Sequence, residues 1–96
     1  MTTLEQEFSA ALRSAIRECY KLGYMPTRFE QMLDAADAVK VAKRLVTSGE
    51  LQDGLKRIKR LGRLDLSMEQ IMLEKRFSPL FTAQELQAAE WRLSQL

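Results

Sequence analysis

The residues best able to do chemistry in this sequence are basic ones, concentrated in the stretch 56–63 (KRIKRLGR). Five of these eight positions carry Lys or Arg. Side chains of this kind can bind the phosphates of a nucleic acid or the carboxylates of an acidic protein surface. They can also form the solvent-exposed face of a helix and bind nothing in particular. The basic stretch therefore poses the main functional question.

Residue types needed for most catalytic and metal sites are missing. The sequence has no histidine and a single cysteine, Cys19, which excludes histidine-dependent triads and the usual His or Cys zinc sites. No phosphate-loop, dinucleotide or nucleophile-elbow motif is present. We therefore predict a protein that is not an enzyme and has no metal and no cofactor. Cys19 lies among apolar helix positions, which favours a buried structural thiol over a reactive one.

Asp65 is the one candidate for carboxylate chemistry. It follows Arg63 by two residues and precedes Ser67, so a guanidinium could hold its carboxylate in place. We expect no partner carboxylate close enough to form an acid/base pair with it. A short acidic residue just before a helix also interacts favourably with the helix dipole. A carboxylate-dependent enzyme is therefore the least favoured functional class.

The elements that position these residues are predicted to be helices. Apolar residues recur at helical spacing, and Gly23, Gly49 and Gly62 mark helix ends. Candidate capping boxes begin at Thr2, Thr27, Ser67 and Thr82. The helices are expected over residues 4–22, 28–34, 38–47, 51–61, 68–75 and 83–95. We predict an all-α fold in which residues 1–96 form a compact single-domain bundle of five to six short capped helices.

One boundary stays open at this stage. The segment 34–37 (DAAD) could continue a helix, or Asp37 could cap a new one.

The predicted helix 51–61 separates basic from apolar side chains. At 100° per residue its basic residues occupy one side, and Leu51, Leu55, Ile58 and Leu61 occupy the other. A solvated face explains this separation, but not the uniform sign, because such faces usually mix acids with bases. Residues 38–63 hold eight basic and two acidic residues, whereas the remainder holds seven basic and eleven acidic residues. Charge is therefore segregated along the chain.

Two observations weaken specific nucleic-acid recognition. No aromatic residue lies between Phe29 and Phe77, so the basic region lacks a platform for stacking bases. In a helix-turn-helix interpretation, the neighbouring helix 68–74 offers only Gln70 for reading base edges. Nonspecific binding to a phosphate backbone remains an alternative.

Trp91 is a candidate contact residue on the last helix. It lies about 200° from Ala89 around the helix, outside the apolar stripe. An exposed tryptophan is typical of an interface anchor, although an N-terminal segment could instead bury it.

The leading hypothesis is a non-enzymatic interaction or adaptor module whose basic helix face binds an acidic surface of a protein partner. The alternative is a sequence-nonspecific DNA- or RNA-binding protein that uses the same face. No window resembles a membrane span or a signal peptide, so we expect a cytoplasmic protein with no membrane partner. The oligomeric state stays open. The candidate binding residues are Lys40, Lys43, Arg44, Lys56, Arg57, Lys59, Arg60, Arg63 and Trp91.

Residues 24–73 and 77–86 resemble an uncharacterised small helical domain that recurs in bacterial proteins. The motifs that carry this resemblance are YMPTRFEQML, AKRL, GRLDLS and LFT. The resemblance implies an accessory role but no activity and no catalytic residue. Three positions depart from the pattern: Asp37 replaces a usual glycine, and Lys59 with Arg60 replace a usual aromatic and a usual acid. The strong basic face can therefore be a feature of this chain in particular.

Overall fold

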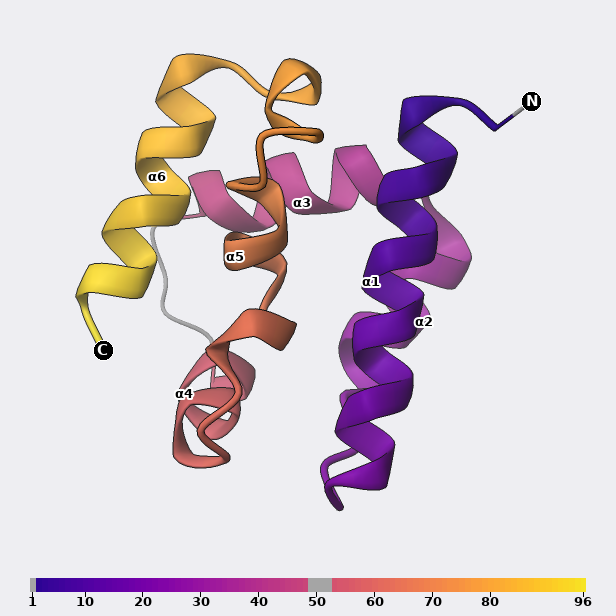
Figure 1. Cartoon of the computed structure of the whole chain (residues 1–96), viewed down its shortest axis with the longest axis vertical. Coiled ribbons are helices and arrows are strands. Elements are labelled where there is room, and N and C mark those ends of the chain that lie inside the picture. The colour runs from indigo at the N-terminus through magenta and orange to yellow at the C-terminus, as the bar shows by residue number, and fades with distance from the viewer. Residues whose placement is uncertain (1, 49–52) are drawn as a thin grey trace.

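A computed structural model describes residues 2–48 and 53–96 (Figure 1). The described residues form α-helices and short 3₁₀ turns, with no strand among them, which confirms the all-α prediction. The elements, in chain order, are α1 (Leu4–Lys21), α2 (Thr27–Ala35), α3 (Ala38–Thr47), α4 (Asp53–Arg60), η1 (Leu64–Leu66), α5 (Met68–Met72), η2 (Ser78–Leu80) and α6 (Ala83–Ser94). None of these helices combines the length and apolar character needed to cross a membrane.

The core lies between the first and last helices. Both α3 and α5 contact α1 on one side and α6 on the other, as Figure 1 shows. Buried apolar side chains from these four helices form one cluster, which includes Leu12, Val41, Met72 and Ala89. Short helices are marginal alone, so this shared burial is what stabilises them.

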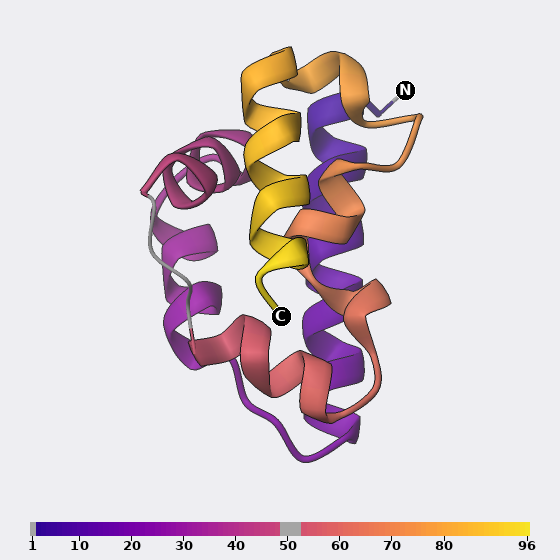
Figure 2. The same ribbon diagram turned by 90° about the vertical axis from the view of Figure 1, so that its left-hand side faces the viewer.

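Helix α4 occupies one end of the molecule. In Figure 2 it crosses the lower end, beside the loop that joins α1 to α2. Its main packing partner is η1, and Leu55 is its buried residue. Gly62 follows α4 with a positive φ of 71°, and the amide of Arg63 donates to the carbonyl of Ile58, which closes the helix as the sequence predicted.

Two predicted helix starts were wrong in detail. The first helix is capped by Thr3 with Gln6 rather than by Thr2 with Glu5, because either adjacent threonine satisfies the same spacing rule. Thr27 does not cap α2 but is its first residue. Pro26 takes the cap position without a side-chain hydrogen bond. The carboxylate of Glu30, expected to complete that box, instead accepts a 2.5 Å hydrogen bond from the Tyr20 hydroxyl.

Other boundaries follow from local hydrogen bonds. Ala36 is extended, and the Asp37 carboxylate accepts a hydrogen bond from the amide of Val39. The helix is therefore interrupted at these two residues, and α2 and α3 are separate helices. Helix α5 ends at Met72 rather than at residue 75, because successive turns follow it up to Ser78. The Thr82 capping box with Glu85 is confirmed. The predicted start of helix 51–61 at Leu51, and the helix end at Gly49, lie outside the described residues.

Candidate docking surface

Helix α4 exposes the basic side chains that the sequence placed on one face. Leu55 is buried, and Ile58 and Leu61 are half-buried on the inner side. The four basic residues of the helix, Lys56, Arg57, Lys59 and Arg60, are all exposed. The predicted separation of basic and apolar sides is thus confirmed for the described part of this helix.

The neighbours of these four cations differ. The Arg57 guanidinium lies over the Tyr24 ring, 5.4 Å from its centroid, which orients the cation without neutralising it. The Lys59 ammonium donates to the carbonyl oxygen of Leu96. Within residues 2–48 and 53–96, neither Lys56 nor Arg60 forms an ion pair. The face therefore keeps its positive charge.

Arg63 is a weaker candidate than its neighbours on α4. Its Nε and one terminal nitrogen donate to the two Asp65 oxygens at 3.1 and 3.2 Å. These hydrogen bonds hold the pKa of Asp65 below its ordinary value. Both side chains are substantially exposed. The pair is a local surface ion pair, and it shows the contact between the Arg63 guanidinium and the Asp65 carboxylate that their spacing in the sequence allowed.

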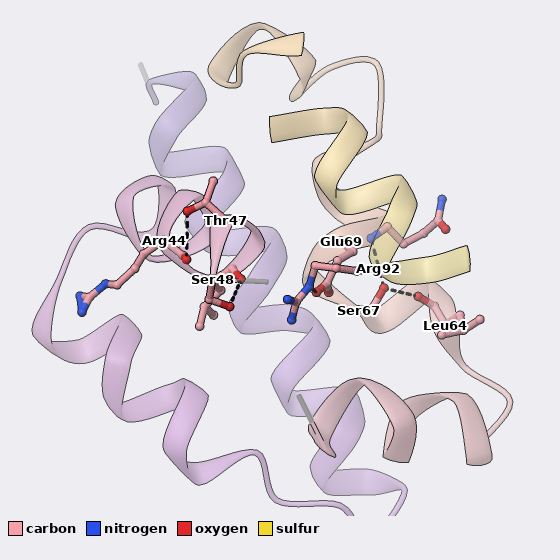
Figure 3. Close-up of polar contacts among 9 residues, drawn as sticks. Arg44, Thr47, Ser48, Leu64, Ser67, Glu69 and Arg92 are labelled. Atoms are coloured by element: carbon pink, nitrogen blue, oxygen red, sulfur yellow. Dashed lines mark hydrogen bonds and ion pairs between the residues drawn. The ribbon is translucent and has the colours of Figure 1, made fainter. Parts of the chain in front are cut away.

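The three basic candidates on α3 belong to another part of the surface. Figures 1 and 2 both place α3 apart from α4. Lys43 lies 3.7 Å from the Glu85 carboxylate, and Lys40 and Arg44 are exposed. In Figure 3 the Arg44 side chain points away from the rest of the labelled group. The nine predicted residues therefore do not form one continuous site.

Trp91 is exposed, at 49% of its surface, so the alternative of a buried tryptophan is wrong. The next residue, Arg92, is instead fully buried: its Nε donates to Glu69 Oε2 at 2.7 Å, linking α6 to α5 (Figure 3). Ser67, next to this pair, is also buried and donates to the Leu64 carbonyl at 2.8 Å.

A hollow of about 580 Å³ lies next to the basic face, between α2 and α4. Its size is within the range of pockets that hold ligands. Most of its lining is apolar, contributed by Met25, Phe29, Met32, Leu55, Ile58 and Leu66. Arg28 and the ring of Tyr24 also line it, and Glu69 contributes the one carboxylate among the described lining residues. Sequence reasoning did not find this hollow, because its lining comes from segments far apart in the chain.

Two features that could support catalysis, a metal-binding cluster and a reactive thiol, can be checked among the described residues. No cluster of three or more acidic or thiol side chains among them could hold a metal ion. Cys19, which lines the hollow, is buried. Burial raises the pKa of its thiol, and this outweighs the opposing effect of the Arg63 guanidinium.

The Cys19 thiol should consequently react slowly in the folded protein. At neutral pH we expect iodoacetamide to alkylate it more than about tenfold slower than in urea, because a buried thiol with a raised pKa supplies little thiolate. Mass spectrometry gives both rates directly, since Cys19 is the sole cysteine. Equal rates in the two conditions would show that the thiol is reactive.

Comparison with known proteins adds no information about the surface around α4. No family model, curated protein or solved structure matches the chain. The resemblance to a small helical bacterial domain therefore stays a prediction. Any functional assignment rests on the geometry of the described residues.

Proposed function

We propose that the chain is a non-enzymatic helical interaction module that binds an acidic surface of a partner protein through the exposed face of α4. This basic face consists of Lys56, Arg57, Lys59 and Arg60. The observation that carries the proposal is that these four cations share one exposed face and that no described side-chain carboxylate forms an ion pair with any of them. A partner's carboxylates would complement it.

The energetics of the isolated helix support this interpretation. Lys56 and Arg60 are four residues apart, and like charges at this spacing destabilise a helix by about 0.2–0.5 kcal/mol. Binding to an acidic surface would offset the repulsion.

Exposed apolar side chains near the basic face favour a protein partner over a nucleic acid. Met25 is 66% exposed and lines the hollow beside Leu55 and Ile58. Protein interfaces are enriched in Met, Arg and aromatic residues, whereas binding to phosphates needs only the cations. Tyr24, the aromatic residue beside α4, contacts Arg57 on its ring. Nonspecific nucleic-acid binding through the basic face is the second candidate, supported by the uniform sign of the charge.

Charge reversal on α4 tests the proposal. The double variant Lys56→Glu with Arg60→Glu should retain the helical spectrum and capture partner proteins at least about tenfold less, because rim charges govern association. The matched control is Lys40→Glu with Arg44→Glu on α3. Each double variant changes the formal net charge from +2 to −2. Quantitative mass spectrometry after affinity capture from a lysate compares them.

Equal losses in the two double variants would reduce the effect to net charge and contradict a specific face. Fluorescence anisotropy with labelled duplex DNA, single-stranded DNA and RNA then separates the two candidates. For duplex DNA, a plot of the logarithm of the binding constant against the logarithm of the salt concentration with a slope of about −0.9 per neutralised phosphate would favour the nucleic-acid alternative. An absence of binding at low salt would remove it.

A further inference from the structure

The hollow between α2 and α4 has the features of an open pocket that could bind a side chain, rather than those of an enclosed packing cavity. It is as large as known ligand pockets, and exposed residues such as Met25 and Arg28 line it. Two methionines, Met25 and Met32, give it adaptable walls. Phe29, Leu55 and Ile58 supply further apolar surface.

Charge at the edge of the hollow is positive. Arg28 lines it directly, and Arg57 lies over the ring of Tyr24, another lining residue. Both arginines are exposed, and neither forms an ion pair within the described parts of the chain. The lining carboxylate, Glu69, is already bonded to Arg92. An occupant that carries negative charge beside an apolar group is therefore complementary to this site.

We propose that the hollow receives a bulky apolar side chain from an acidic segment of the partner protein whose carboxylates contact the basic face of α4. This inference rests on the proposed function and names the chemistry of the partner. It combines the two recurring parts of a protein interface, an anchor buried in a pocket and a complementary charged rim.

A pair of synthetic peptides tests the two parts separately. The first is a fluorescein-labelled amphipathic acidic peptide of about four helical turns, with Trp and Leu on one face. The second has Ala in place of Trp and Leu but the same charge. We expect the first peptide to bind about tenfold to a hundredfold more tightly, because burying one large apolar side chain contributes that much. In ¹⁵N-HSQC spectra it should shift amides in residues 24–32 and 54–58.

Two matched pairs of protein variants complete the experiment. Met25→Ala should weaken binding of the first peptide, whereas Leu22→Ala should not. Both residues are exposed and lie in the same loop region, but Leu22 does not line the hollow. Arg28→Glu with Arg57→Glu should also weaken binding, whereas Lys40→Glu with Arg44→Glu, which changes the net charge equally, should not.

The outcomes distinguish this inference from the proposed function. Equal affinities for the two peptides, together with a loss in Lys56→Glu/Arg60→Glu, would overturn the role of the hollow and support the basic face. If the first peptide binds more tightly than the second and no charge reversal changes its affinity, the result would support a binding role for the hollow and contradict one for the basic face. If neither peptide binds, the inference is overturned, and only the capture experiment then tests whether the basic face binds a partner protein. Shifts confined to residues outside the hollow would also overturn it.

Discussion

Replacing Arg92 with methionine is expected to lower the free energy of unfolding by about 3–5 kcal/mol, although no apolar contact of α6 is directly deleted. Arg92 is 1% exposed and its partner Glu69 is 4% exposed, with 2.7 Å between donor and acceptor. Removing the guanidinium leaves a buried carboxylate without its cation, which is far more costly than losing an exposed pair. Urea unfolding followed by circular dichroism measures the change, and urea avoids the screening that a guanidinium salt would add.

A double variant and an exposed pair serve as controls. Arg92→Met combined with Glu69→Leu removes both charges and should be more stable than Arg92→Met alone, because no unpaired charge remains. Arg13→Gln breaks the ion pair of Arg13 with Asp34, whose side chains are 34% and 63% exposed, and should cost less than about 1 kcal/mol. A loss for Arg92→Met no larger than that for Arg13→Gln would contradict the buried role.

The buried pair also shows why sequence reasoning missed the position of Arg92. Periodicity places residue 92 three positions after Ala89, on the inner side of α6. Charged residues are rarely buried unless paired, so the sequence pattern predicts an apolar stripe of Leu86, Ala89, Leu93 and Leu96 on this helix and leaves Arg92 out. Its partner lies 23 residues away in sequence, on another short helix. Only the packing of α5 against α6 brings the two together.

Sequence reasoning was more successful where the controlling interactions are local. The helix start at Thr82, the helix ends at Gly23 and Gly62, and the two sides of α4 depend on residues within about one or two turns. The error at Thr2 arose because Thr2 and Thr3 each precede a suitable partner by three residues.

The candidate surface was predictable only in part, for the same reason. The basic side of α4 follows from periodicity, but the position of Arg57 over Tyr24 and the bond from Lys59 to Leu96 join distant segments. Lys40, Lys43 and Arg44 were grouped with α4 because they are near it in sequence. The fold separates them, since α3 packs against α1 and α6 whereas α4 lies at one end of the molecule (Figures 1 and 2).

Replacing Phe8 with alanine should also lower the free energy of unfolding by about 3–5 kcal/mol, through loss of packing rather than of charge. The Phe8 ring is completely buried and meets Phe77 and Phe81 edge-on, with both centroids 5.3 Å away. These contacts attach α1 to the segment around η2. Alanine leaves a cavity that the short 3₁₀ turn and α6 must close, and urea unfolding measures the cost. A loss below about 1 kcal/mol would show that the three rings are not a packing unit.

The milder substitution Phe8→Leu separates stability from binding. Leucine fills much of the same volume, so it should cost clearly less than alanine and leave the protein folded. Phe8 lies near the start of α1, whereas α4 is at the opposite end of the molecule in Figure 1. We therefore expect Phe8→Leu to lower stability while leaving the affinity for the acidic amphipathic peptide unchanged. A parallel loss of affinity would mean that the docking surface depends on the packing of the whole bundle, and the effects of charge reversal on α4 would then have to be corrected for stability.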